Sequence, residues 1–227
     1  GKELYSSQVI PNRGAWLEYE TDSNDIFYVR VDRTRKLPVT SLLRSIGFVT
    51  DEQILDLFAN DPKIKATLDK DTIKTQDEAI IEIYKKLRPG ELPTADAARN
   101  LFDGLFFDNR RYDLAKVGRY KFNKKLCLAT RITGQVAYDD IVDPSTGEVL
   151  AEKNTRITAE AAEAIQDSGI NIVDVLVDDQ KVRVIGNGIV NIHKMLPNVD
   201  LSDLHFKEGV NYNVLKSIMD TTPDEKL

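Results

Sequence analysis

The side chains best suited to chemistry in this sequence are cations and aromatic rings, a combination that binds nucleic acid. Residues 110–125 read RRYDLAKVGRYKFNKK and hold seven basic residues and one acidic residue, within a chain of net charge −6. Two smaller basic clusters lie at 30–36 and 85–88, and aromatic residues lie in or beside all three clusters. A basic stripe with aromatic rings on an otherwise acidic chain favours contact with a phosphate backbone. The alternative interpretation is a solvated helix face.

Trp16, the single tryptophan, is the most informative aromatic residue. The segment 15–20 alternates between apolar and polar residues, and this alternation places Trp16 with Glu18 and Glu20 on the polar face of a strand. Such a ring either is covered by a neighbouring loop or receives a flat partner. An unpaired nucleobase stacked on an aromatic ring contributes ~1–3 kcal/mol. Both interpretations stay open from the sequence.

No convincing catalytic or metal site emerges from the remaining reactive residues. The sequence has neither a Gly-x4-Gly-Lys-Ser loop nor a Gly-x-Gly-x-x-Gly loop. The pairs 139–140 and 178–179 are aspartates, which indicate exposed turns at strand ends more than a cation site. His193 and His205 are isolated, and Cys127 lies between leucines, which indicates a small buried side chain.

Length and composition indicate a globular protein. The chain has 227 residues, of which 41% are hydrophobic and 30% are charged, enough for one large or two small domains. Its longest apolar runs are short, whereas a membrane span needs ~20 residues. One cysteine fits a reducing compartment. The absence of an initial Met, and a helix-start pattern at 222–225 that only two residues follow, lead us to expect a piece of a longer protein.

The elements expected in the first half are a β-hairpin followed by helices. Residues 15–20 and 27–32 alternate as two strands with one solvated face. Capping boxes at 50–53 and 75–78 predict two helix starts, and Asp61 and Thr94 predict two more. A further helix, which includes Leu114 and Val117, carries the basic stripe.

The second half is expected to be rich in strands. Residues 132–142 and 149–150 predict two strands around a turn at 143–147, and residues 173–177 and 182–184 predict another pair. A helix from Thr158 to Gly169 lies between them. We therefore expect a mixed α+β fold with an N-terminal β-hairpin, a helical middle and a β-rich insertion. The insertion is 128–189, and residues 1–127 with 190–227 form the main body.

Two long stretches of the chain, 2–58 and 87–126, resemble a known family. The resemblance is carried by VIPNRGAWLE at 9–18, VRVDRTRKLP at 29–38, TDEQILDLF at 50–58, LRPGE at 87–91, LFF at 105–107, RYDL at 111–114 and VGRYKFN at 117–123. Together they are similar to the lobe domain of the bacterial RNA polymerase β subunit. Residues 127–227 resemble Gram-positive versions of this domain more loosely.

The resemblance implies a non-catalytic lobe within DNA-directed RNA polymerase, a nucleotidyltransferase. In the family the lobe lines the DNA cleft and contacts the non-template strand and the downstream duplex during transcription. The implied partners are DNA, the β-prime, alpha and omega subunits and a sigma factor, with no membrane. The implied location is the cytoplasm, at the nucleoid. Magnesium is held by β-prime in the family, so we expect no cofactor in this chain and no activity from it alone.

The resemblance also assigns roles to individual residues. Trp16 matches the tryptophan that stacks on an unpaired non-template base, and Asp32 and Arg33 match residues beside the same strand. Arg88 and Arg111 match arginines that reach single-stranded promoter DNA.

Arg35 and Arg119, from the basic clusters, complete the predicted DNA-binding set. The family usually has Arg where this chain has Thr34, which weakens the local positive charge. The main alternative is a structural lobe that contacts β-prime or sigma without touching DNA. An independent enzyme is the second alternative, and the missing catalytic site argues against it.

Overall fold

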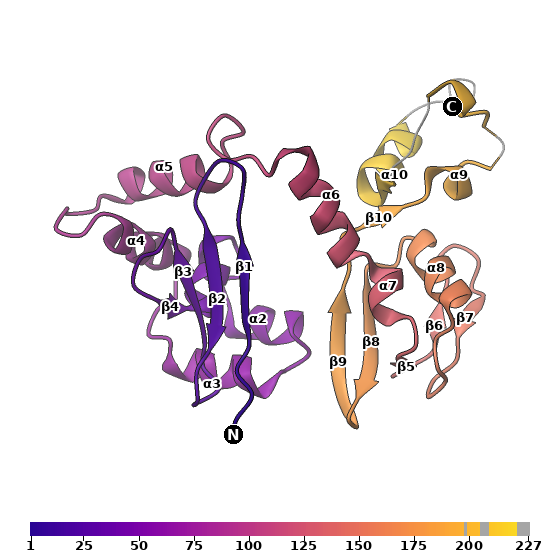
Figure 1. Cartoon of the computed structure of the whole chain (residues 1–227), viewed down its shortest axis with the longest axis horizontal. Coiled ribbons are helices and arrows are strands. Elements are labelled where there is room, and N and C mark those ends of the chain that lie inside the picture. The colour runs from indigo at the N-terminus through magenta and orange to yellow at the C-terminus, as the bar shows by residue number, and fades with distance from the viewer. Residues whose placement is uncertain (198, 205–208, 222–227) are drawn as a thin grey trace. The chain divides into compact units, whose positions relative to one another are not determined.

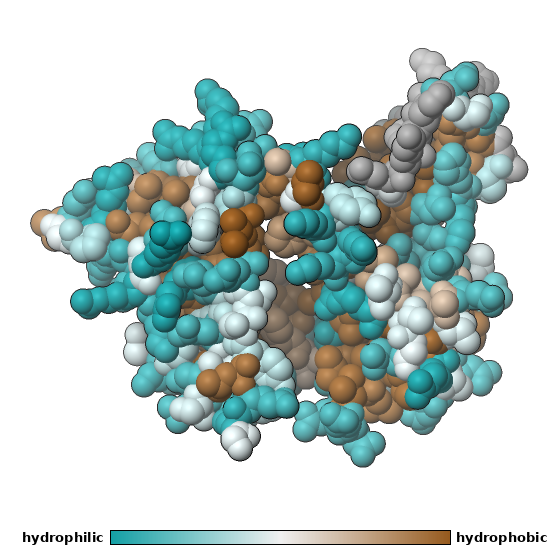
Figure 2. All heavy atoms as spheres, viewed as in Figure 1, coloured by the Kyte–Doolittle hydropathy of each residue, from teal (hydrophilic) through white to brown (hydrophobic). Residues whose placement is uncertain are grey.

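The computed structural model describes residues 1–197, 199–204 and 209–221 in two compact units, Gly1–Tyr120 and Lys121–Leu227 (Figure 1). The predicted helix start at 222–225 and His205 lie outside the described residues. In the described part no helix combines the length and apolar character that crossing a membrane requires. The visible faces of both units are mainly hydrophilic, and smaller hydrophobic patches lie among the hydrophilic residues (Figure 2).

The first unit contains a four-stranded antiparallel sheet. Its strands, in the spatial order of the sheet, are β1 (Ser6–Val9), β2 (Leu17–Thr21), β3 (Phe27–Val31) and β4 (Leu37–Pro38). The predicted hairpin is confirmed, because β2 and β3 pair from Leu17 opposite Val31 to Thr21 opposite Phe27. Val29 and Val31 are fully buried, which is the inward face that the alternation predicts.

Five helices follow in the first unit. They are α1 (Val39–Ser45), α2 (Asp51–Leu57), α3 (Pro62–Lys70), α4 (Gln76–Leu87) and α5 (Ala95–Phe106). The predicted capping boxes at the starts of α2 and α4 are both present, and the side chains of Asp61 and Thr94 cap α3 and α5. These starts could be predicted because each cap is a local interaction.

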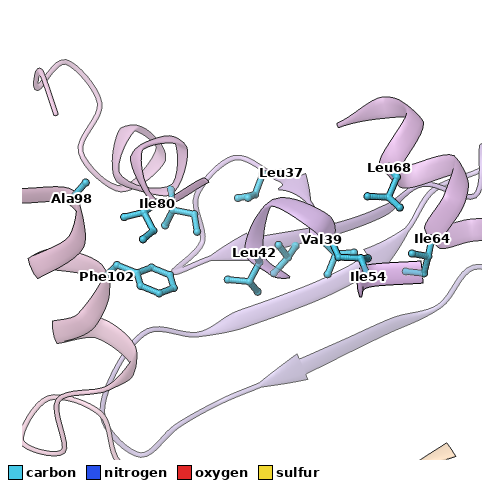
Figure 3. Close-up of a cluster of buried hydrophobic side chains, with 11 residues drawn as sticks. Leu37, Val39, Leu42, Ile54, Ile64, Leu68, Ile80, Ala98 and Phe102 are labelled. Carbon is cyan, nitrogen blue, oxygen red and sulfur yellow. The ribbon is translucent and has the colours of Figure 1, made fainter. Parts of the chain in front are cut away.

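The core of the first unit lies between the helices and the inward face of the sheet. Figure 3 shows side chains from α1, α2, α3 and α5 gathered in one layer with Leu37 of β4. Val29, Ile54 and Ile83 are almost completely buried in it. Burial of one such side chain contributes about 1.5–3 kcal/mol. The core therefore covers one face of the sheet, while Tyr28 and Arg30 on the opposite face of β3 are only half-buried.

A twelve-residue helix, α6 (Ala115–Leu126), carries the predicted basic stripe and contains the boundary between the units. None of its residues is buried, and Val117 and Tyr120 are exposed.

Within its described residues, the second unit contains three small antiparallel sheets. One is ordered β5 (Val136–Ala137), β8 (Ile172–Val177) and β9 (Gln180–Ile185), and the others pair β6 (Ile141–Val142) with β7 (Val149–Ala151) and β10 (Ile189–Val190) with β11 (Val210–Asn211). Its helices are α7 (Leu128–Ile132), α8 (Ala159–Asp167), α9 (Ile192–Met195), a 3-10 turn (Ser202–Leu204) and α10 (Tyr212–Thr221).

The prediction of a continuous strand over 132–142 is wrong. Ile132 ends α7, in which it and Leu128 are buried at helical spacing, and Gly134 has φ +79°. Only β5 and β6 form strands in this range. The rest of the strand prediction, including β7 and the β8–β9 hairpin with its turn at Asp178 and Asp179, is confirmed.

The α+β class is confirmed by both units. The predicted insertion at 128–189 within a body of 1–127 and 190–227 stays a prediction. The structure divides the chain at 120 and 121 instead of at 127 and 128.

Candidate nucleic-acid interface

Trp16 directly precedes β2 and is half-buried. Its carbonyl oxygen accepts a hydrogen bond from the Asp32 N–H at 2.8 Å, which extends the β2–β3 pairing by one position. The guanidinium carbon of Arg33 lies 4.7 Å from the centroid of the indole ring. A cation over a tryptophan face is attracted by about 0.5–1 kcal/mol at an exposed site. The structure therefore brings three predicted site residues together at one point.

The turn after β3 aims the Arg33 side chain at the indole. Asp32 and Arg33 have φ angles of 52° and 62°, in the left-handed region, and the Thr34 N–H donates to the Val31 carbonyl at 3.2 Å. Two consecutive left-handed residues are typical of a tight hairpin turn, in which Asn or Asp is usually followed by Gly. Asp32 fits this pattern, but Arg33 stands where Gly is usual, at a cost of order 1 kcal/mol. This turn is a strained segment beside Trp16.

The acidic residues beside Trp16 are largely occupied by neighbours. Glu20 forms ion pairs with Arg30 at 3.3 Å and Lys36 at 3.1 Å, and Glu18 accepts a hydrogen bond from Gln8 at 3.1 Å. The negative charge of Glu20 is thus compensated by the basic cluster at 30–36. The compensation comes from Arg30 and Lys36, which lie on the same side of the sheet.

The loop that carries Trp16 is fixed to a distant segment of the first unit. Arg13 and Asp113 exchange two backbone hydrogen bonds of 3.0 and 2.8 Å, and the Arg13 guanidinium donates to the Arg110 carbonyl at 2.7 Å. Gly14, with φ +123°, packs so closely on Tyr112 that an added Cβ would lie 2.5 Å from a ring carbon. Residues 10–16 and 110–113 therefore form one surface.

Arg111 lies on this surface, over the end of α5. Its guanidinium passes Gly104, where an added Cβ would lie only 3.1 Å from an arginine nitrogen. Its Nε is 3.8 Å from Asp108, and the two line an open groove of about 550 Å³ with the exposed ring of Phe107. The Arg110 backbone N–H, followed by the Arg110 and Arg111 charges, lowers the pKa of Asp108. Asp108 is therefore ionised at neutral pH.

The other predicted arginines differ in their surroundings. Arg119 on α6 lies 2.9 Å from Asp113, whose pKa is lowered first by the Ala115 N–H and then by Arg119. Arg35 is exposed and has no ion-pair partner within the described part of the chain.

Arg88 follows the last turn of α4 and forms an ion pair with Glu91 at 3.4 Å. Glu91 also accepts a hydrogen bond from the Tyr84 hydroxyl at 2.6 Å, which lowers the pKa of Glu91 and raises that of Tyr84. Arg88 therefore belongs to the end of α4, and no hydrogen bond or ion pair joins it to the loop of Trp16.

Arg13, which anchors the loop, is not among the residues predicted for the site. Its only signal is a basic residue inside the Pro-Asn-Arg-Gly turn at 11–14. Its pairing with Asp113 joins segments far apart in the chain, and no local pattern predicts such a contact.

Metal-binding chemistry finds no support among the described residues, which contain no group of three or more His, Cys, Asp or Glu side chains suited to an ion. Cys127, at the start of α7, is half-buried, whereas the sequence predicts burial. Its thiol lies 3.1 Å from the side-chain oxygen of Gln166 in α8.

Comparison with known proteins gives consistent results. The family described as "RNA polymerase Rpb2, domain 2" matches residues 2–141. The DNA-directed RNA polymerase subunit beta of Clostridium botulinum (strain Alaska E43) is 57% identical over 225 residues, and that of Clostridium perfringens (strain 13) is 56% identical over 226. These alignments cover 99% and 100% of this chain, which spans 18% of the length of each relative.

Proposed function

Because this chain belongs to the RNA polymerase Rpb2 domain 2 family, we propose that it forms the DNA-contacting lobe of a bacterial RNA polymerase β subunit. The family match and the clostridial relatives confirm the resemblance to the β subunit on which the sequence-based expectations depend. The lobe would line the DNA cleft and contact the non-template strand and the downstream duplex. Its other partners would be the β-prime, alpha and omega subunits and a sigma factor.

The observation that carries this proposal is the pairing of Trp16 with Arg33. A half-buried indole has a defined orientation, and the guanidinium 4.7 Å from its centroid supplies a positive charge at the same place. A nucleotide has a flat base and an anionic phosphate, and these two groups match the two side chains. Asp32 fixes the Trp16 backbone through its N–H, and the unpaired Arg35 adds a cation in the same loop.

The remaining arginines would bind phosphates without reading bases. Arg111 lies within the segment 110–113, which is hydrogen-bonded to the loop before Trp16, and Arg119 forms an ion pair with Asp113 of that segment. Arg88 lies at the end of α4. The chain would carry out no chemistry itself. In the whole enzyme, β-prime would supply the magnesium ion for nucleotide addition.

A specific observation favours the alternative of a structural lobe that contacts β-prime or sigma. Arg88, Arg111 and Arg119 each lie within 4 Å of a carboxylate of this chain, so a phosphate must compete with those carboxylates. These pairs are exposed, and exposed pairs contribute about 0–1 kcal/mol. A phosphate can therefore replace these carboxylates at a small cost in free energy, so the ion pairs are compatible with DNA binding as well.

The salt dependence of single-stranded DNA binding tests the proposal. We expect log K for a labelled oligonucleotide to fall linearly with log salt concentration, because bound phosphates release counterions. Fluorescence anisotropy of the 227-residue chain measures this slope. If the chain does not bind the oligonucleotide even at low salt, the DNA role is overturned and the alternative of a structural lobe is supported.

A further inference from the structure

A second candidate site in the first unit is a groove of about 290 Å³ beside β4. Tyr28, Lys36 and Pro38 line it from the sheet side, Lys70 lines it from the end of α3, residues 71–73 line it from the segment that follows, and Glu82 and Lys86 line it from α4. Three of the lining residues are lysines, and none of them belongs to the predicted DNA-binding set.

The acidic residues of the groove are already occupied. Asp71 is 5% exposed, and its Oδ2 accepts hydrogen bonds from the hydroxyls of Thr40 at 2.5 Å and Ser41 at 3.0 Å. Its Oδ1 accepts from the Ile73 N–H at 3.0 Å. Both oxygens thus fix the floor of the groove and the segment 71–73. Buried carboxylates that are hydrogen-bonded in this way hold a backbone in one conformation.

The lysines differ in how much of their charge is neutralised. Lys36 lies 3.1 Å from Glu20 and 4.2 Å from the centroid of the Tyr28 ring, and Lys86 lies 3.2 Å from Glu82. Lys70, the last residue of α3, is exposed and has no ion-pair partner in the described part of the chain. Among the described residues, Lys70 is therefore the one lysine of the groove without an ion-pair partner, and it ends α3 next to Asp71, whose carboxylate accepts from hydroxyl and N–H groups.

We propose that this groove binds one phosphate group, with Lys70 as the main ligand and Lys36 and Lys86 at its sides. A lysine ammonium is a compact point charge with three donors, which suits a phosphate oxygen approached from solvent. The phosphate source is a nucleic acid strand, and this part of the inference rests on the proposed function.

The position of the groove along the sheet supports that source. Trp16 is hydrogen-bonded to Asp32, and Tyr28 at the groove lies four residues before Asp32 on the same strand and turn. At ~3.3 Å per residue this separation is about 13 Å. At ~3.4 Å per nucleotide, the spacing along one strand of a B-form duplex, it corresponds to about four nucleotides, and to fewer in an extended single strand. Lys36 lies in the loop that also carries Arg33 and Arg35, so this loop leads from the site of Trp16 to the groove.

The first test uses inorganic phosphate and the variants Lys70→Gln and Lys65→Gln. Both lysines lie on α3 and are exposed, and each substitution removes one positive charge, but only Lys70 lines the groove. We expect phosphate to shift the backbone amide NMR signals of Thr72 and Ile73 saturably in the wild type and in Lys65→Gln, and not in Lys70→Gln. Equal shifts in all three proteins, or no shift in any, would overturn the site. An acidic peptide that shifts these signals while phosphate does not would also overturn it, in favour of a protein partner.

The second test separates this inference from the proposed function. We expect Lys70→Gln to reduce the salt slope for long single-stranded DNA by roughly one, and Lys65→Gln to leave it unchanged. Phosphate binding without any DNA binding would support the groove and refute the DNA role. Loss of phosphate binding in Lys70→Gln with an unchanged DNA slope would overturn the nucleic acid as the phosphate source.

Discussion

Arg13 and Asp113 exchange two backbone hydrogen bonds of 3.0 and 2.8 Å, although they lie at opposite ends of the first unit's sequence. This short pairing attaches the loop before Trp16 to the segment that carries Arg110 and Arg111. The position of the indole therefore depends on contacts made far from β2. A change that weakens this attachment should affect DNA binding without altering any residue that touches DNA.

Gly14→Ala tests that dependence. Its φ of +123° strains an alanine, and the new Cβ would lie 2.5 Å from the Tyr112 ring, so that the loop must move. We expect a loss of about 2–3 kcal/mol in the free energy of unfolding, and weaker single-stranded DNA binding by the folded protein. Urea unfolding followed by circular dichroism, with anisotropy on the same sample, measures both.

Gly47→Ala is the matched control. Gly47 has φ +115°, but nothing lies within 4 Å of an added Cβ, so only backbone strain remains. We expect a stability loss of about 1 kcal/mol and unchanged DNA affinity. Equal effects of the two variants would show that the contact with Tyr112 does not position the loop.

Asp51→Asn should destabilise the first unit through Arg44. The Arg44 side chain is 1% exposed, and its guanidinium donates to Asp51 and to the Val49 carbonyl. The variant leaves this buried charge without its carboxylate, and we expect a loss of about 2–3 kcal/mol in unfolding free energy. Asp77→Asn, which breaks the exposed pair with Arg99, should cost less than about 1 kcal/mol.

Acidification should remove the same stabilisation in the wild type. The hydrogen bond from Arg44, and then its charge and that of Lys74, hold the pKa of Asp51 below its usual value. The contribution is therefore complete above the ordinary Asp pKa of about 4 and is lost as the pH falls through the lower folded-state pKa. Unfolding free energies measured from pH 6 downward should fall less steeply in Asp51→Asn. Parallel pH profiles of the two proteins would contradict this.

Several elements of the first unit could be predicted because their causes are local. The hairpin follows from the alternation of residues 15–20 and 27–32, and the starts of α2 and α4 follow from capping boxes within four residues. The strand predicted over 132–142 is wrong because α7 extends to Ile132, Gly134 follows with φ +79°, and the neighbouring strands are only two residues long. Short strands of that kind depend on tertiary pairing more than on pattern.

The candidate site could be predicted only in part, for the same reason. Alternation predicts the face of Trp16, and charge clustering predicts a basic cluster at 30–36, within which only the family resemblance selects Arg33. The contact between them depends on two left-handed residues, at Asp32 and Arg33, where the sequence shows no glycine or asparagine. The attachment of Arg13 to Asp113 is a long-range pairing, which local residue preferences do not encode.

The 227-residue chain alone should extend no RNA on a DNA template supplied with magnesium and nucleotides. In the described part no cluster of acidic residues is suited to hold the ion. Incorporation of labelled nucleotide, compared with a mock preparation, measures this. Template-dependent synthesis above the mock level would contradict a non-catalytic lobe.

Replacing Arg88, Arg111 and Arg119 together with alanine should weaken single-stranded DNA binding about equally for all sequences. Each arginine would contact a phosphate, so the salt slope should flatten by roughly one unit per contact. Their carboxylate partners would also be released, and this adds negative charge to the surface. An unchanged slope would assign the three arginines to protein partners or to solvation.

Trp16→Ala should weaken single-stranded DNA binding more than any other single substitution. Loss of base stacking at ~1–3 kcal/mol corresponds to roughly 5- to 150-fold in affinity. Trp16→Phe should lose less, because a smaller ring still stacks. The half-buried indole also supports Arg33, so Trp16→Ala should cost about 1 kcal/mol of stability, far below the ~3–5 kcal/mol of a fully packed tryptophan.

Arg33→Ala distinguishes the two ways in which the cation over Trp16 could act. If its guanidinium binds the phosphate of the stacked nucleotide, affinity falls and the salt slope flattens by roughly one, which is the result we expect. If it only covers the ring, its removal exposes the indole and affinity rises with no change in slope. Melting temperature and DNA affinity measured on both variants complete the test. A large stability loss in Trp16→Ala with unchanged affinity per folded molecule would assign the indole to packing, because a base that stacks on it cannot leave binding unaffected.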